Sequence, residues 1–174
     1  FQNAIYAIYN CAAVLCCMGV NGVSDECANE VFKTFTMHKG RNELFDLNGK
    51  CLLNLVKNPT GANEVMKAIM KNHEDKNIMI ILNDHDQDGR DVSWIWDAHF
   101  DLLIDEHTKR ILCSGTRAYD IALRMKYEGY ENIEVYEHVE DGIIRLKELK
   151  EDAYVIATYT ALQSTRSIIR RHAS

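Results

Sequence analysis

The sequence predicts an α/β domain with a Rossmann-like, mostly parallel sheet flanked by helices, preceded by a short helical segment. From Cys51 onward, short apolar runs typical of buried strands alternate with longer amphipathic stretches typical of helices. Residues 1 to 40 lack such runs and carry apolar residues at helical spacing. Repeated strand–helix units favour parallel strands covered by helices. We therefore expect a helical segment at residues 1–45 and an α/β domain at residues 46–174.

The composition indicates a globular chain with one substantial core. Its 174 residues are 47% hydrophobic and 26% charged, with a single proline. A net charge of -6 argues against nonspecific nucleic-acid binding. The apolar run at residues 13–20 is too short to span a bilayer, and no positive residue precedes it as a signal peptide requires. The six cysteines contain no C-x-x-C pair, so we expect reduced core thiols and no zinc ribbon within these residues.

The helical segment should contain two helices. The first covers residues 2–20 and ends near Gly19, while Ser24 can cap a second helix over residues 24–35. Asn48-Gly49 then indicates a hairpin turn.

The α/β domain should contain six strands and four helices. The expected strands cover residues 52–56, 77–83, 100–105, 110–115, 132–137 and 153–159. The expected helices cover residues 61–73, 116–129, 141–150 and 160–171, with Thr116 as a cap of the second of these.

Polar residues follow several of these strands, and ligands of parallel sheets bind outside the carboxyl ends of the strands. Asn58 fits either a ribose contact or an ordinary strand-to-helix turn. Residues 115–117 fit either an anion site at a helix start or a simple cap. The sequence has no G-x-x-x-x-G-K-[ST] motif, so these residues cannot bind ATP phosphates through a P-loop.

The acidic stretch NDHDQDGRDVSWIWD, residues 83–97, begins like an EF-hand calcium loop. The twelfth loop position, counted from Asp84, must supply a bidentate Glu, but it is Ile95. This excludes an EF-hand and leaves a weak three-aspartate cation site or a solvated turn as alternatives; we expect no metal site. Asp88-Gly89 should make the turn, and Arg90 should pair with a carboxylate.

The two tryptophans that follow, Trp94 and Trp96, would face the same side of an extended segment. Such a pair suits a protein interface, in which tryptophan anchors carry much of the binding energy. The alternative is an acidic turn over a buried tryptophan pair.

Several of these motifs resemble a known family. FQNAIYAIYNCAA and GRNE resemble the end of a Mur ligase central domain. LVKNPTGANE, LNDHDQDGRDVSWIWDAHFD, SGTRAYD and ATYTAL resemble the C-terminal domain of the MurT family, the Mur ligase-like subunits of lipid II isoglutaminyl synthase. The resemblance covers essentially the whole chain. The family's P-loop and four-cysteine zinc ribbon lie upstream of these motifs, so we expect a C-terminal part that is inactive alone.

The resemblance implies an activity in peptidoglycan biosynthesis. The intact enzyme would use ATP and Mg²⁺ to activate the α-carboxyl of D-glutamate in the lipid II stem peptide. Ammonia released from glutamine by a GatD-type glutaminase would then give D-isoglutamine. This implies a cytoplasmic enzyme that works at the inner face of the membrane through lipid II, with zinc only in the upstream region.

The resemblance also assigns residues. An aspartate of the C-terminal domain completes the Cys-His pair of the glutaminase, and this role falls on Asp91; a carboxylate that accepts the imidazole N–H fixes the tautomer. The expected ATP contacts are Arg41 and Asn58, and the expected partner interface is formed by Asp88, Arg90, Trp94 and Trp96. Two alternatives are a folylpolyglutamate-type amino-acid ligase domain without a glutaminase and a noncatalytic docking domain.

Overall fold

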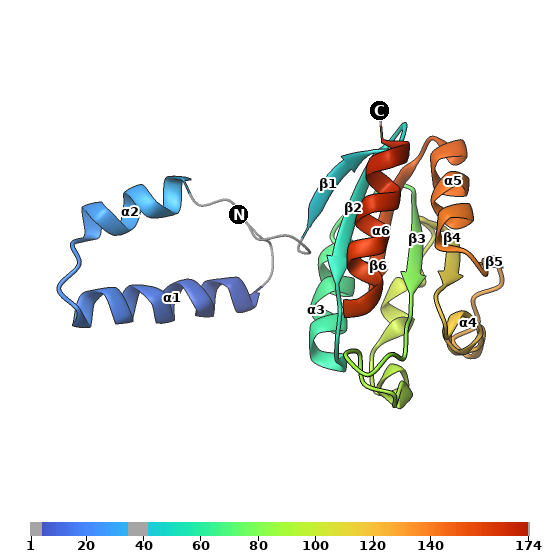
Figure 1. Cartoon of the computed structure of the whole chain (residues 1–174), viewed down its shortest axis with the longest axis horizontal. Helices are drawn as coiled ribbons and strands as arrows, with labels where there is room; N and C mark the ends of the chain where they lie inside the picture. Colours follow the sequence, from blue (N-terminus) through green and yellow to red (C-terminus); the bar gives the residue numbers. More distant parts are fainter. Residues whose placement is uncertain (1–4, 35–41, 174) are drawn as a thin grey trace. The chain divides into compact units, whose positions relative to one another are not determined.

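The computed structural model describes residues 5–34 and 42–173 and divides the chain into two units, Phe1–Lys39 and Gly40–Ser174 (Figure 1). The first unit holds helices α1 (Ile5–Val20) and α2 (Asp25–Thr34). Ser24 caps α2 as predicted, since its hydroxyl accepts the N–H of Cys27 at 3.3 Å. Helix α1 continues one residue beyond Gly19, and the chain turns through Gly22, which has φ +71°.

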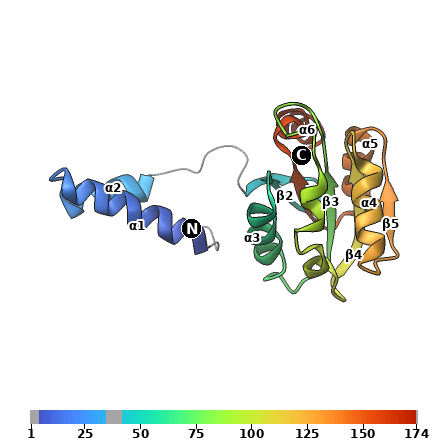
Figure 2. The ribbon, with the colours of Figure 1, turned by 90° about the horizontal axis from the view of Figure 1, so that it is seen from below.

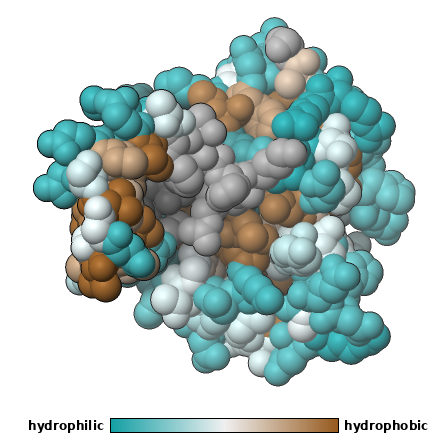
Figure 3. All heavy atoms as spheres, turned by 60° about the vertical axis from the view of Figure 1, so that its left-hand side comes forward, coloured by the Kyte–Doolittle hydropathy of each residue, from teal (hydrophilic) through white to brown (hydrophobic). Residues whose placement is uncertain are grey.

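The first unit exposes much of its apolar surface. Ile8, Val14 and Leu15 of α1 are all exposed, whereas Ala28 of α2 is buried. Figure 3 shows hydrophobic side chains, coloured brown, at the molecular surface. The core that supports a functional site therefore lies in the second unit.

The second unit is built on a six-stranded sheet with the order β1-β2-β6-β3-β4-β5. Strand β1 pairs antiparallel with β2, and the other neighbours are parallel, which confirms the predicted fold class. The predicted hairpin joins β1 to β2, with Asn48 at φ 62°. Strand β1 itself was not expected from the sequence. The strand bounds are β1 (Glu43–Asp46), β2 (Lys50–Leu55), β3 (Lys76–Ile81), β4 (Thr108–Ser114), β5 (Ile133–Val135) and β6 (Asp152–Ala157).

Helices cover both faces of the sheet (Figures 1 and 2). Helices α3 (Pro59–Ile69) and α4 (Ala118–Tyr127) pack on one face, and α5 (Val139–Leu149) and α6 (Tyr159–His172) pack on the other. Side chains of β3 alternate between these two cores: Ile78 and Ile80 face α3 and α4, while Met79 and Ile81 face α5 and α6. All six residues of β3 are buried, as expected for a central parallel strand.

The connection from β3 to β4 contains no α-helix. It forms two short 3₁₀ helices, η1 (Ser93–Trp96) and η2 (Phe100–Leu103), so the predicted strand at residues 100–105 is wrong. Phe100 and Leu103 are buried in the same core as α3 and α4, which explains the apolar run that suggested a strand. The buried guanidinium of Arg124 donates to the carbonyl oxygens of Ile95 at 3.1 Å and Ala98 at 3.2 Å, fastening this connection to α4.

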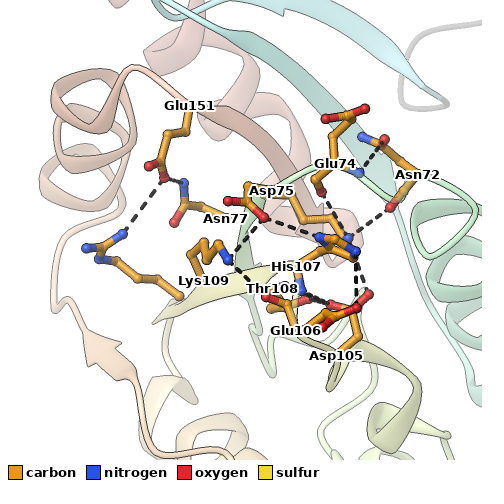
Figure 4. Close-up of polar contacts among 12 residues, drawn as sticks. Asn72, Glu74, Asp75, Asn77, Asp105, Glu106, His107, Thr108, Lys109 and Glu151 are labelled. Carbon is orange, nitrogen blue, oxygen red and sulfur yellow. Dashed lines mark hydrogen bonds and ion pairs between the residues drawn. The ribbon is translucent and has the colours of Figure 1, made fainter.

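A polar cluster lies at the amino ends of β3, β4 and β6 (Figure 4). Its centre is Lys76, whose side chain is completely buried. The ammonium group donates to the carbonyl oxygens of Asn72 at 2.9 Å and Glu74 at 3.3 Å, and lies 3.5 Å from a carboxylate oxygen of Asp105. A buried charge with such partners is costly to disturb, so this cluster is part of the scaffold.

Candidate functional site

The candidate site lies at the carboxyl ends of β3 and β6, where the chain leaves the two strands toward opposite faces of the sheet. Ligands of α/β sheets bind at such a switch point. Asn83, just after β3, joins three segments there. Its backbone N–H donates to the Thr158 hydroxyl at 3.0 Å, its side-chain amide donates to the Thr160 hydroxyl at 3.0 Å, and its side-chain oxygen accepts the N–H of Thr116 at 3.1 Å. Three polar segments therefore meet at one edge, namely the chain after β3, residues 115–117 and residues 158–160. They meet through Asn83, which was not among the candidate site residues predicted from the sequence.

Asp84 lies beside Asn83 and holds the start of α4. Its carboxylate accepts the hydroxyl of Thr116 at 2.8 Å and a guanidinium N–H of Arg117 at 3.3 Å, and Arg117 also forms a two-point ion pair with Asp120. The Thr116 hydrogen bond, followed by Arg117, lowers the pKa of Asp84, and Arg117 lowers the pKa of Asp120. The predicted cap by Thr116 is wrong, because its hydroxyl is bound to Asp84 and α4 has no side-chain cap.

The turn into α4 needs glycine at position 115. Gly115 has φ +96°, a left-handed conformation that side chains disfavour. A Cβ atom there would also collide with the carbonyl oxygen of Leu82. This close approach keeps the ends of β3 and β4 together beneath the site.

The acidic loop, residues 84–92, turns at Asp88-Gly89 as predicted, with Gly89 at φ +88°. Arg90 pairs with a carboxylate, also as predicted: its Nε lies 2.7 Å from Asp86. The carboxylate of Asp88 is engaged by Thr160, accepting its backbone N–H at 2.8 Å and its hydroxyl. Asp88 is therefore more than a turn residue, since it binds the loop to the start of α6.

Asp91 is exposed on this loop, and one of its oxygens accepts the backbone N–H of Ser93 at 2.8 Å. That bond, aided by the Ser93 hydroxyl, lowers the pKa of Asp91, so the group is ionised at neutral pH. Arg90 does not hold it, because its guanidinium is turned toward Asp86.

A cation site made of the three aspartates is not supported. Asp84, Asp86 and Asp88 are directed to different partners, namely Thr116 with Arg117, Arg90, and Thr160. Within residues 5–34 and 42–173, no group of three or more His, Cys, Asp or Glu side chains is arranged to hold a metal ion.

The two tryptophans do not share one face. Residues 93–96 are a 3₁₀ helix, so the expectation for an extended segment is wrong. Trp94 is half-buried against the core, whereas Trp96 is 50% exposed. The Trp96 and Tyr127 rings pack edge to face with their centroids 5.5 Å apart, and the Arg124 guanidinium carbon lies 5.2 Å from the centroid of the Trp96 ring. Trp96 is thus an aromatic side chain that is held by Tyr127 and Arg124 and exposes half of its surface to solvent.

Of the two expected ATP contacts, Arg41 lies outside the described residues. Asn58 is exposed and caps α3, since its side-chain oxygen accepts the N–H of Gly61 at 2.8 Å. The turn interpretation of Asn58 is therefore correct, and its amide N–H groups are donors that suit a contact with a nucleotide.

Five of the six cysteines divide into a buried and an exposed group, and Cys11 is partly buried. Cys51 and Cys113 are buried, and burial raises the pKa of each thiol to about 12, so neither is a reactive nucleophile. Cys16, Cys17 and Cys27 are exposed, and the expectation that they are core thiols is wrong.

Comparison with known proteins identifies the family. Residues 55–162, more than half of the chain, match the family described as MurT ligase C-terminal. The chain belongs to this family. The matched region contains the acidic loop, the rim residues of β3 and β4, and the start of α6.

Two relatives extend the similarity along the chain. The subunit MurT of lipid II isoglutaminyl synthase (glutamine-hydrolyzing) from Streptococcus pneumoniae is 31% identical over 171 residues, which are 96% of this chain and 38% of that protein. The same subunit from Staphylococcus aureus is 32% identical over 156 residues, 88% of this chain and 36% of that protein. The chain thus spans little more than a third of the length of these MurT relatives.

Solved structures show the same fold. The folylpolyglutamate synthase of Thermotoga maritima matches 97% of this chain and 39% of its own with a TM-score of 0.65 at 19% identity. The UDP-N-acetylmuramate-alanine ligase MurC of the same organism matches 97% of this chain and 38% of its own with a TM-score of 0.68 at 12% identity. The predicted Mur ligase C-terminal type of fold is confirmed. In the part of the chain that the structure describes, no helix has the length and apolar character needed to cross a membrane.

Proposed function

We propose that this chain is the C-terminal part of the ligase-like subunit of a lipid II isoglutaminyl synthase. The whole enzyme would convert D-glutamate of the lipid II stem peptide to D-isoglutamine, with ammonia from a GatD-type glutaminase. Membership in the MurT family supports this proposal, as do two relatives named for this activity. Since the chain spans little more than a third of their length, we expect no amidation by the chain alone.

The role proposed for this chain's own residues centres on Asp91. A glutaminase with a Cys-His pair needs a carboxylate that accepts the imidazole N–H, sets the tautomer and stabilises the imidazolium. The exposed, ionised Asp91 suits this role, and the observation that carries the proposal is its bond to the Ser93 N–H. A carboxylate has about four acceptor positions, so this bond leaves room for an imidazole donor from another subunit.

Asp88 is the rival candidate, three residues earlier. Both of its oxygens accept hydrogen bonds from Thr160, one of them from the backbone of a helix start. Two of its roughly four acceptor positions are thus taken, against one for Asp91, and Asp88 is less exposed than Asp91. The local geometry therefore favours Asp91 as the group presented to a partner.

The surface around Asp91 fits a subunit interface. We propose that this interface is formed by Asp88, Arg90, Trp94 and Trp96. The half-exposed Trp96 is the strongest anchor, because it is already ordered by Tyr127 and Arg124 and would lose little freedom on binding.

We further propose that ATP and Mg²⁺ are held mainly by the upstream region, which would also carry the zinc site. ATP supplies the phosphoryl group that activates the substrate carboxyl. Asn58 would donate its amide N–H groups to the nucleotide while its oxygen keeps capping α3, and Arg41 would add a guanidinium contact. We also propose that the enzyme works in the cytoplasm, at the inner face of the membrane through lipid II.

Co-expression of the full-length subunit with the glutaminase tests the proposal. We expect the two to co-purify and glutamine hydrolysis to depend on the ligase-like subunit. A glutaminase that hydrolyses glutamine equally fast without it would contradict the proposal. Failure to co-purify, together with glutamate or another amino acid as the incoming nucleophile, would instead favour an amino-acid ligase.

A further inference from the structure

We propose that Asp88 is a positioning residue: its carboxylate ties the acidic loop to the amino end of α6, and this tie sets where Asp91 is presented. The catalytic consequence rests on the proposed function. The tie itself is a property of the chain and can be tested without any partner.

The tie connects parts of the chain that are distant in sequence. Thr160, 72 residues after Asp88, gives its backbone N–H at 2.8 Å and its hydroxyl to the two carboxylate oxygens. Because Thr160 is the second residue of α6, its N–H belongs to the helix start, where backbone donors have no partner within the helix. A negative charge at this end is also favoured by the helix dipole.

Asp88 takes the place of a local cap. Thr158 stands at the cap position of α6, but it makes no side-chain cap hydrogen bond, and its hydroxyl accepts the N–H of Asn83. The helix start therefore receives its side-chain acceptor from the loop. The Thr160 hydroxyl is further fixed by the amide of Asn83 at 3.0 Å, so the anchor point is rigidly held by the end of β3.

Asp91 lies between two anchors. Asp88 precedes it by three residues, and Val92, which is buried, follows it directly. The other contacts within the loop are two backbone bonds of one turn, from the N–H of Asp88 to His85 at 2.8 Å and from the N–H of Gly89 to Asp86 at 3.4 Å, and the Arg90–Asp86 pair, whose side chains are 79% and 78% exposed. A pair so exposed to water constrains little. Loss of the Asp88 tie should therefore free residues 85–91 while leaving Val92 and Ile95 packed.

Hydrogen exchange of the chain alone tests the tie. Asp88→Ala should raise the exchange rate of the Thr160 amide by about tenfold or more, because that amide loses its acceptor. The amides of residues 88 and 89 should also exchange faster, because the turn that holds their bonds to His85 and Asp86 is no longer fixed to α6. Asp101→Ala is the matched control, an exposed aspartate of the same β3–β4 connection whose carboxylate lies 3.6 Å from the ring of His99. The chain's two tryptophans, Trp94 and Trp96, should keep their emission spectra and show that the following segment stays folded. Unchanged exchange in Asp88→Ala would overturn the proposal.

Glutamine hydrolysis by the full complex tests the consequence. Misplacement of a catalytic group by about 1 Å can cost on the order of 10²-fold, so Asp88→Ala should lower kcat about tenfold or more with an unchanged KM for glutamine. Thr160→Ser keeps both donors and should preserve kcat. A weakened contact with the Asp91 carboxylate also lowers the pKa of the partner histidine. The limb of the pH–rate profile that reports this histidine should therefore move to lower pH. Simple loss of folded protein would lower the rate without moving this limb.

The two proposals fail in different ways. If Asp88→Ala raises exchange and Asp91→Asn lowers kcat, but Asp88→Ala leaves kcat and the pH profile intact, the positioning role is wrong and the proposed function stands. If Asp91→Asn leaves kcat unchanged, the role proposed for Asp91 is wrong, and the positioning role falls with it even where exchange shows the tie itself.

Discussion

Asp91 and Ser93 are joined by a hydrogen bond of 2.8 Å, from the backbone N–H of Ser93 to a carboxylate oxygen of Asp91. Such a bond between an aspartate and the backbone two residues later is a local turn that orients the carboxylate. This bond orients the Asp91 carboxylate on the backbone at the start of η1, while the Asp88 carboxylate fixes the part of the loop that precedes Asp91.

This bond can be removed without touching Asp91. Ser93→Pro deletes the N–H at the first position of η1, whereas Ser93→Ala keeps the N–H and deletes only the hydroxyl. We expect the pKa of Asp91 to rise toward its ordinary value in Ser93→Pro and to rise less in Ser93→Ala. Carboxyl chemical shifts measured by NMR over a pH titration check this. A larger rise in the alanine variant would show that the hydroxyl is the main donor.

Trp96 should be an anchor for the glutaminase. Truncating a buried aromatic anchor typically costs about 2 kcal/mol or more, so Trp96→Ala should weaken the complex by roughly tenfold or more. Ile144→Ala is the control, since Ile144 is partly exposed on α5, on the opposite face of the sheet. Surface plasmon resonance with the immobilised glutaminase gives both affinities. Equal affinities for the two variants would place the interface elsewhere.

Asn58 offers a matched pair of substitutions. Asn58→Asp keeps the cap oxygen and removes the amide donor, whereas Asn58→Ala removes both. In the full-length subunit we expect both variants to bind ATP more weakly in calorimetry. Only Asn58→Ala should also lose stability, by about 1 kcal/mol. Wild-type affinity for ATP in Asn58→Asp would remove Asn58 from the nucleotide site.

Asp84, which follows β3, and Asp120, in the first turn of α4, should make the folded chain less stable as the pH falls into the acid range. The pKa values of Asp84 and Asp120 are lowered in the folded chain, chiefly by Thr116 for the first and Arg117 for the second. Groups of this kind stabilise the fold above their unfolded pKa of about 4, and this contribution is lost as the pH falls through the folded value. Arg117→Gln should therefore reduce the drop in Tm between pH 6 and pH 3. Arg90→Gln, which breaks a largely exposed pair, should change that drop less.

The sequence predicts the sheet well because β3 and its neighbours are buried on both faces, and a short run that is apolar throughout is typical of such a strand. It fails between residues 93 and 105. There Phe100 and Leu103 are apolar because they fill space between α3 and α4, and a short run of this kind has no periodicity that separates a strand from a 3₁₀ helix.

The candidate site, too, could be predicted from the sequence only in part. The Asp88-Gly89 turn and the Arg90–carboxylate pair are local, and both could be predicted. The bond from Asp88 to Thr160 could not, because it spans 72 residues and depends on how β3 and β6 lie side by side. Asn83 was missed for the same reason, although its place directly after a buried strand is a signal for a rim residue.

The most direct test of the central claim is the glutamine hydrolysis rate of the complex with Asp91→Asn. This change keeps the shape of the side chain but removes its charge and can favour the wrong histidine tautomer. The equivalent change in a serine protease costs about 10⁴ in turnover. Because a thiol nucleophile depends less on its histidine, we predict a loss of roughly 10² or more, on the scale of that case, with co-purification intact. An unchanged rate with an intact complex would contradict the account, and loss of activity in Asp88→Asn alone would move the catalytic role three residues toward the amino terminus.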